Sequence, residues 1–141
     1  VDDVLSLHGQ TRIELLVADA RSKCGCGGDW YRTAVWTLQR NNINIQALCK
    51  DVLKLLQNGR REDTPVRVLM GRLGGEGKSF FYSPLRNVYG LENIQATPQP
   101  GSFPLLGLER KKIVLLDDWV FDESVLTLPT QLLWYEGQPS R

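Results

Sequence analysis

The stretch Val66-Arg67-Val68-Leu69-Met70-Gly71-Arg72-Leu73-Gly74-Gly75-Glu76-Gly77-Lys78-Ser79 decides the expected fold, because it joins a β-type run to a glycine-dense loop and a Lys-Ser pair. Glycines let a chain curl closely enough for backbone N–H groups to converge on phosphate oxygens. A lysine in this place reaches the β- and γ-phosphates, and the adjacent hydroxyl binds Mg²⁺. We therefore expect a nucleotide-binding P-loop formed by Gly71, Gly74, Gly75, Gly77, Lys78 and Ser79.

The loop departs from the P-loop formula in one respect. The formula places its first glycine five positions before the second, which here is Arg72, whereas Gly71 lies six positions before Gly77. The loop is thus one residue longer than the formula, or its first glycine has been replaced. The alternative interpretation is a glycine-rich turn with a solvated lysine.

A second segment supports the first. Lys112–Leu116 is a near-continuous apolar run that ends in Asp117-Asp118, and such runs suit strands buried on both faces of a parallel sheet. Nucleotide-binding sites of open α/β sheets lie at the carboxyl ends of the strands, and ATPases need an acidic residue there. We predict that Asp117 holds Mg²⁺ together with Ser79, and that Asp118 positions the attacking water. Asp117 and Asp118 are therefore the candidate catalytic residues.

The first part of the chain has a helical pattern. Apolar stripes at helical spacing predict helices over residues 11–22, from Asp29 as N-cap to about Arg40, and from about Ile45 to Leu56. A further short helix is expected over residues 129–137. The predicted fold class is α/β: a helical segment, 1–62, followed by a partial P-loop NTPase (AAA+-like) core with a parallel sheet, 63–141.

Composition limits the class of protein. The 141 residues are 42% hydrophobic and 23% charged, with a formal net charge of +1, which is typical of a globular domain and not of a polybasic tail. No apolar run is long enough for a membrane span, and the first residues do not resemble a signal peptide. Three cysteines argue against a secreted disulfide framework. Cys24 and Cys26 favour a tight glycine-rich turn over a zinc site, which usually has four ligands.

Several strings, taken in order, resemble the superfamily 3 helicase-like proteins, which are the Rep-type replication-initiator ATPases of parvoviruses and of related mobile elements. The resemblance covers most of the chain from about residue 24 onward. It rests on Cys26–Trp30, Leu38–Ile43, Leu55–Arg60, Gly77–Phe80, Ser83–Leu85, Phe103–Glu109, the run that ends in Asp117-Asp118-Trp119, and Leu132–Pro139.

The resemblance implies an ATP- and Mg²⁺-dependent hydrolase that assembles into a homo-oligomeric ring and moves single-stranded DNA during viral or mobile-element DNA replication. It implies an intracellular location, in the host nucleus for a viral protein. The family's sensor, pore-loop and arginine-finger motifs are expected beyond Arg141. An arginine finger contributes orders of magnitude to the rate, so we expect this stretch alone to bind nucleotide better than it hydrolyses it.

Two other classes compete with this interpretation. A small-molecule P-loop kinase would have a similar glycine loop, but it needs an arginine-rich lid, and residues 86–141 hold only three scattered arginines. A non-enzymatic assembly or binding module, derived from a degenerate helicase, would keep the helices without engaging phosphate.

Overall fold

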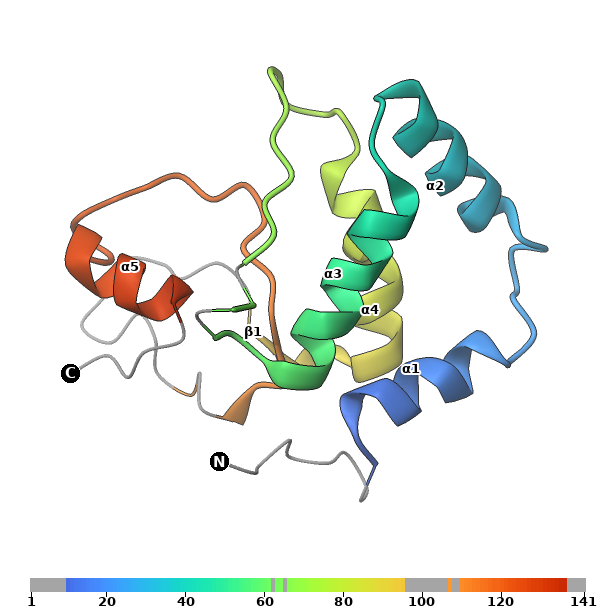
Figure 1. Cartoon of the computed structure of the whole chain (residues 1–141), viewed down its shortest axis with the longest axis horizontal. Helices are drawn as coiled ribbons and strands as arrows, with labels where there is room; N and C mark the ends of the chain where they lie inside the picture. Colours follow the sequence, from blue (N-terminus) through green and yellow to red (C-terminus); the bar gives the residue numbers. More distant parts are fainter. Residues whose placement is uncertain (1–9, 62, 65, 96–106, 108–109, 137–141) are drawn as a thin grey trace.

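The computed structural model describes residues 10–61, 63–64, 66–95, 107 and 110–136 (Figure 1). The helices of this part are α1 (Arg12–Ala20), α2 (Asp29–Arg40), α3 (Ile45–Asn58), α4 (Ser83–Tyr89) and α5 (Leu128–Tyr135). Two short 3₁₀ helices, η1 (Lys78–Tyr82) and η2 (Leu91–Asn93), flank α4. The strands are β1 (Ile94–Gln95) and β2 (Ile113–Val114).

Side-chain caps mark where α1 and α3 begin, whereas α2 follows a glycine. Thr11 accepts a hydrogen bond from the Glu14 N–H, and the Glu14 carboxylate accepts one from the Thr11 N–H, which is a complete capping box for α1. Asn44 caps α3 in the same way through the Ala47 N–H. The expected N-cap at Asp29 is wrong by one residue. Gly28, with φ of 88°, precedes α2, and Asp29 is its first residue.

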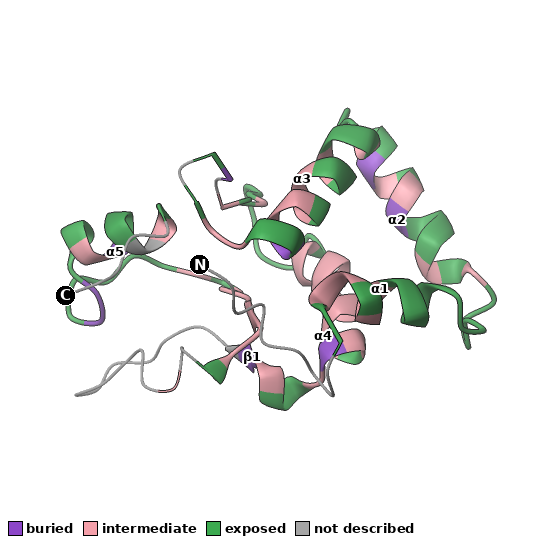
Figure 2. Ribbon diagram, turned by 60° about the horizontal axis from the view of Figure 1, so that its bottom comes forward, coloured by how far each residue is buried: buried purple, intermediate pink, exposed green. Residues whose placement is uncertain are grey.

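The main hydrophobic core lies where α1, α3 and α4 meet the strand pair. Leu56, Tyr89 and Ile94 are buried at its centre, and Tyr89 is only 1% exposed. The partly buried side chains around them come from both halves of the chain: Ile13, Leu15, Leu16, Val52, Leu85, Val88, Ile113 and Leu115. In Figure 1, α3 and α4 run side by side at the centre, and Figure 2 shows that their buried and half-buried residues gather there.

Tyr89 also joins α4 to α1 by a polar contact. Its hydroxyl donates to the carbonyl oxygen of Arg12 at 2.7 Å. Burial raises the pKa of this hydroxyl, and the nearby Arg12 guanidinium opposes that rise. Core packing and this hydrogen bond together hold α1 against α4, so the predicted segments 1–62 and 63–141 share one core. Their division into two domains stays a prediction.

The segment around β2 contributes to two hydrophobic clusters with alternate residues. Ile113 and Leu115 pack against the main core, whereas Val114 and Leu116 pack against a second cluster centred on Val125 and Leu126. Side chains alternate between the two faces of an extended chain, which produces this division. The run therefore packs against a cluster on each side, but its residues are half-buried, and the expected strand buried on both faces of a parallel sheet is wrong.

The predicted parallel-sheet core is wrong. Within the described residues, β1 and β2 form a single parallel pair of two residues each, in which Ile94 lies opposite Ile113. Val66–Met70, the expected first strand, is not part of it, and Val68 and Met70 are 72% and 88% exposed. β-Propensity reflects the fit of a side chain to a half-buried pleated surface, and no neighbouring strand provides that surface here. Helix packing instead supplies the larger core.

Candidate functional site

The glycine loop adopts a backbone conformation that requires glycine at two positions. Gly75 and Gly77 have φ of 77° and 78°, in the left-handed region that side chains disfavour. Directly after Gly77 the chain enters η1 with Lys78, and the Phe80 N–H donates to the Gly77 carbonyl oxygen at 3.1 Å. The predicted order of glycine loop, Lys-Ser and helix is therefore present, although the helix begins as a 3₁₀ turn.

Ser79 and Asp117 lie in direct contact. The Ser79 hydroxyl donates to Asp117 Oδ1 at 2.6 Å, across a sequence separation of 38 residues. Both side chains are half-buried. The structure thus brings together the hydroxyl and the carboxylate that the sequence assigns to Mg²⁺.

Two further side chains from the same helical stretch face Asp117. Arg86 Nη2 lies 3.3 Å from Asp117 Oδ2. The pKa of Tyr82 is raised, first by burial and then by the negative charge of Asp117. Ser79, Tyr82 and Arg86 follow one another at spacings of three and four residues, so they share one face of η1 and α4. This face brings the Ser79 hydroxyl and the Arg86 guanidinium to the Asp117 carboxylate, with Tyr82 close enough for the charge of Asp117 to raise its pKa.

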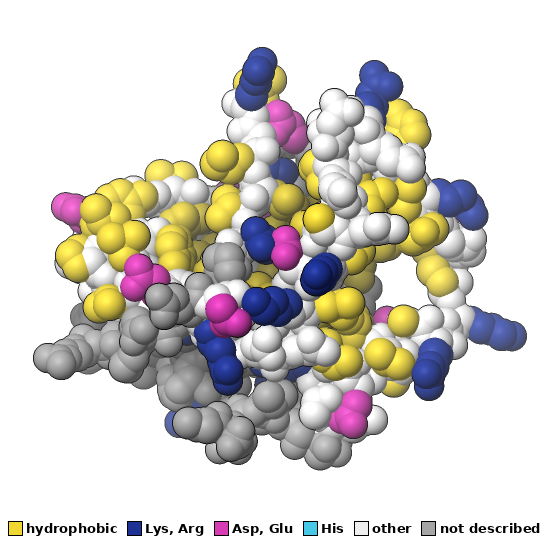
Figure 3. Space-filling model, viewed as in Figure 1, with side chains coloured by type: hydrophobic (Ala, Val, Ile, Leu, Met, Phe, Trp, Pro, Cys, Tyr) yellow, Lys and Arg dark blue, Asp and Glu magenta, His cyan; other side chains and the backbone are white. Residues whose placement is uncertain are grey.

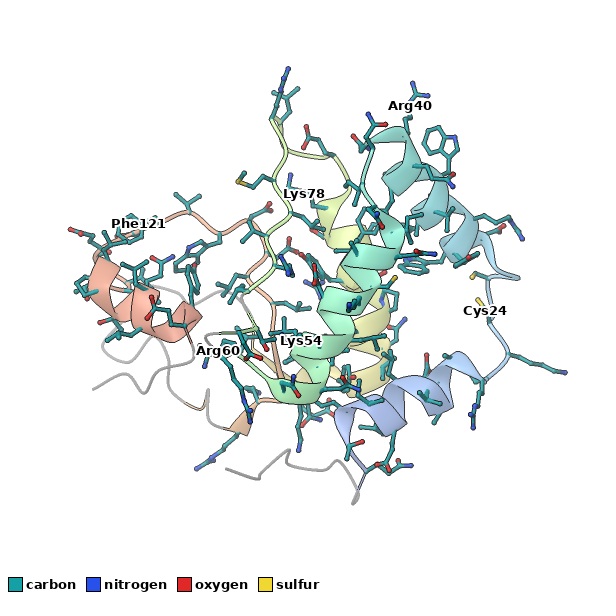
Figure 4. The ribbon with its side chains drawn as sticks, in the orientation of Figure 1. Cys24, Arg40, Lys54, Arg60, Lys78 and Phe121 are labelled. Carbon is teal, nitrogen blue, oxygen red and sulfur yellow. The ribbon has the colours of Figure 1, made fainter. Side chains whose placement is uncertain are left out.

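Within the loop, Lys78 is directed toward another acidic side chain. Its Nζ lies 3.5 Å from Glu76 Oε2 and 3.5 Å from the Leu73 carbonyl oxygen (Figure 4). Glu76 Oε1 accepts hydrogen bonds from the N–H groups of Arg72 and Leu73, each at 3.1 Å. The Leu73 N–H is the largest cause that lowers the pKa of Glu76, with Lys78 contributing after it. The Glu76 carboxylate therefore receives two backbone N–H groups and lies beside the Lys78 ammonium.

Gly71 makes this approach possible. A Cβ at position 71 would lie 1.3 Å from Glu76 Oε2, so a side chain there would expel the carboxylate. By contrast, a Cβ at Gly74 or Gly75 would meet no atom within 4 Å. The absence of a side chain at Gly71 thus leaves room for the Glu76 carboxylate, which is bound by N–H groups of the same loop.

Asp118 differs from its neighbour. It is exposed and has a left-handed φ of 49°. In the part of the chain that the structure describes, the contacts with Ser79 and Arg86 are made by Asp117 rather than by Asp118. Its assigned role in positioning water stays a prediction.

The first turn after the loop is supported by α2. Trp30 Nε1 donates to the Phe80 carbonyl oxygen at 3.2 Å, and the two rings stack with centroids 5.5 Å apart. This contact lies one residue after Ser79, so the second helix of the chain helps to fix the orientation of the Lys78-Ser79 turn.

Sequence reasoning missed Glu76 and Arg86 as members of the site. Arg86 was detectable, because it lies seven residues after Ser79, which is two turns along one helix face. Glu76 gave a weaker signal: it is an acid inside a glycine loop, immediately before the Gly-Lys-Ser string. The Glu76 carboxylate accepts from the N–H groups of Arg72 and Leu73 only because of the loop conformation, and composition does not reveal that conformation.

Ser79 and Asp117 fit the ligand chemistry of Mg²⁺. Magnesium is usually held by one or two carboxylates, nucleotide phosphates and water, all of which are oxygen ligands. Arg86 beside Asp117 and Lys78 beside Glu76 place positive charge at this site. On the face in Figure 3, Lys and Arg side chains are interspersed with acids. Lys54–Asp63 and Arg67–Asp51 are further ion pairs among the described residues.

Comparison of the chain with protein-family models, with curated proteins and with solved structures found no match. Among the described residues, no helix is both long and apolar enough to span a membrane.

Proposed function

We propose that this chain binds ATP with Mg²⁺ through the loop 71–79 and Asp117, as the nucleotide-binding segment of a superfamily 3-like replication initiator. The single observation that supports the proposal is the 2.6 Å hydrogen bond between Ser79 and Asp117. A hydroxyl after the loop lysine and a distant carboxylate are the two protein groups that P-loop ATPases use around Mg²⁺.

Each residue of the site has a distinct task in this proposal. Ser79 and Asp117 provide oxygen ligands, and Arg86 keeps the Asp117 carboxylate oriented by pairing with its second oxygen. Lys78 offers a charge to the β- and γ-phosphates. Bound Mg²⁺ would neutralise the phosphate charge, and the half-buried position of Ser79 and Asp117 limits competition from water.

Nucleotide binding on this scheme requires a local change in the loop. The Glu76 carboxylate receives hydrogen bonds from Arg72 and Leu73 and lies beside Lys78, and these are groups that the phosphates need. Two anions do not share one set of donors, because their repulsion adds to the loss of hydrogen bonds. Phosphate therefore displaces Glu76, and only the opened fraction of the loop is competent to bind.

The wider activity belongs to the same proposal. Hydrolysis, ring assembly, single-stranded DNA as a partner and a nuclear location follow from the resemblance to replication initiators. The basic strings Arg60-Arg61 and Arg110-Lys111-Lys112 are the candidates for phosphate contacts with DNA. Contacts with phosphate weaken as the salt concentration rises. A salt series therefore distinguishes phosphate contacts with DNA from packing against aromatic side chains.

Isothermal titration with ATP and Mg²⁺ tests the nucleotide site directly. We expect saturable binding by the wild-type chain and its loss in Lys78→Ala, because that substitution removes the charge that faces the phosphates. Lys50→Ala, which removes an exposed lysine from α3, is the matched control and should bind as the wild type does. No heat with the wild type, or equal heat with Lys78→Ala, would refute the proposal.

A further inference from the structure

A second group of reactive side chains lies outside the candidate nucleotide site, in the loop between α1 and α2. Cys24 and Cys26 are both exposed and free, and they flank Gly25 (Figure 4 labels Cys24). The loop is closed by hydrogen bonds from the Gly27 N–H to the Cys24 carbonyl oxygen at 3.2 Å and from the Asp29 N–H to the Cys26 carbonyl oxygen at 3.1 Å. Closure of this turn keeps the two cysteines near each other.

The surroundings of Cys26 favour its thiolate form. A hydrogen bond from Cys24 is the largest cause that lowers the pKa of Cys26, to about 7. Backbone hydrogen bonds from Trp30, Gly28 and Asp29, at the start of α2, lower it further. The Asp29 carboxylate, which would oppose a nearby thiolate, is paired with Arg32. Arg32 also donates to the Gly27 carbonyl oxygen at 3.3 Å, so its positive charge stays beside the loop.

We propose that Cys24 and Cys26 form a thiol–disulfide exchange site, in which Cys26 attacks an exposed small-molecule disulfide and Cys24 resolves the product. The geometry that supports this is a pair of exposed, free thiols two residues apart in one hydrogen-bonded turn. A Cβ at Gly25 would meet no atom within 4 Å, so the space beside the turn is open to a small molecule.

The exchange is balanced in two steps. The Cys26 thiolate attacks one sulfur of the small disulfide, which forms a mixed disulfide and releases one small thiolate. The Cys24 thiolate then attacks the Cys26 sulfur, forms the Cys24–Cys26 disulfide and releases the second small thiolate. The chain loses two electrons and two protons, and the small disulfide gains them as two thiols.

Oxidised glutathione is the probe, and tryptic mass analysis is the readout. Trypsin cleaves after Lys23 and Arg32, so one peptide contains both cysteines, whereas Cys49 lies in another peptide that ends at Lys50. We expect the peptide 24–32 to lose two hydrogens without retaining glutathione. Stable glutathione adducts at all three cysteines, with no change of this kind in peptide 24–32, would overturn the proposal.

Single substitutions separate the two roles. In Cys24→Ser the mixed disulfide on Cys26 should accumulate, because no neighbouring thiol resolves it. In Cys26→Ser the reaction in the loop should slow, and Cys49→Ser should leave disulfide formation unchanged. A Cys26→Ser chain that reacts as fast as wild type, or a Cys24→Ser chain that accumulates no adduct, would contradict these roles. Circular dichroism of each variant verifies that the helices remain.

The pH dependence provides a second readout, measured on Cys26 in the Cys24→Ser, Cys49→Ser chain, in which Cys26 is the single cysteine. The reference is a peptide of residues 23–28 with Cys24 replaced by serine, whose thiol has an ordinary pKa of about 8.5. A thiol with a lower pKa is more ionised but less nucleophilic. The protein should react faster than the peptide at pH 6 and pH 7, because backbone hydrogen bonds from Trp30, Gly28 and Asp29 still lower the pKa of Cys26, and this advantage should shrink as the pH rises. Equal rates at every pH would contradict activation of Cys26 by its surroundings.

Discussion

Replacement of Glu76 is the perturbation that best separates the proposed nucleotide site from an ordinary glycine turn. Glu76 competes with phosphate for the Arg72 and Leu73 N–H groups, both at 3.1 Å, and for Lys78 at 3.5 Å. The apparent affinity for a ligand falls in proportion to the fraction of protein that is competent to bind it. We therefore expect Glu76→Ala to bind ATP more tightly than the wild type does, although the substitution lies inside the binding loop.

The size of the effect follows from the contacts that Glu76 makes. Two hydrogen bonds from N–H groups to an exposed carboxylate favour the closed loop by about tenfold, and the longer Lys78 contact adds little. Glu76→Ala should thus lower the dissociation constant for ATP with Mg²⁺ about tenfold. Glu76→Gln keeps an acceptor but loses the charge, so about threefold is expected for it.

Calorimetric titration at fixed ionic strength is the assay, with inorganic triphosphate as a second ligand. Glu123→Gln removes the same charge from an exposed position and controls for a general change in net charge. Because hydrogen bonding lowers the pKa of Glu76, its carboxylate stays ionised between pH 8 and pH 6. The ratio of wild-type to Glu76→Gln affinity should therefore be constant over that range. Unchanged or weaker binding by both Glu76 variants, or an equal gain in Glu123→Gln, would refute the reasoning.

Three further predictions concern hydrolysis and stability. If the chain hydrolyses ATP, Asp118→Asn should suppress phosphate release and leave nucleotide binding intact; loss of both in the same proportion would contradict its role. Thr11→Ala removes the capping box of α1 and should reduce the free energy of unfolding by about 1 kcal/mol, measured by urea denaturation. Tyr89→Phe deletes the hydrogen bond to the Arg12 carbonyl and should cost about 1 kcal/mol in the same assay, whereas Tyr89→Ala, which also empties the core, should cost about 3–5 kcal/mol.

The helices were predictable from the sequence because local signals agree. For α3, an apolar stripe at helical spacing predicts a helix from about Ile45 to Leu56, and the structure extends it to Asn58, with Asn44 as its N-cap and Gly59 as its C-cap. The short helix expected over 129–137 corresponds to α5, which ends at Tyr135, before the end of the described residues. The parallel sheet was not predictable from the same kind of signal. Val66–Met70 has the composition of a strand, but whether a segment forms a strand also depends on a neighbouring segment that can pair with it.

The site illustrates the same limit. The sequence named Ser79 and Asp117 because a glycine loop and an apolar run each end in the appropriate side chain, and the structure places them in contact. Their task as metal ligands stays a prediction. Glu76 was missed because its importance depends on left-handed backbone at Gly75 and Gly77 and on the missing side chain at Gly71, whose place its carboxylate takes. These are consequences of three-dimensional closure rather than of residue type.

The alternation of Ile113 to Leu116 between two clusters has a consequence for which sequence changes this chain can accept. Exchange of one aliphatic side chain for another would alter volume but keep each residue on its own side. Insertion or deletion of a single residue would send every following side chain to the opposite cluster. It would also move Asp117 away from Ser79. The spacing from Ile113 to Asp117 is therefore constrained twice, by packing and by the site, and related chains should vary in composition there while keeping its length.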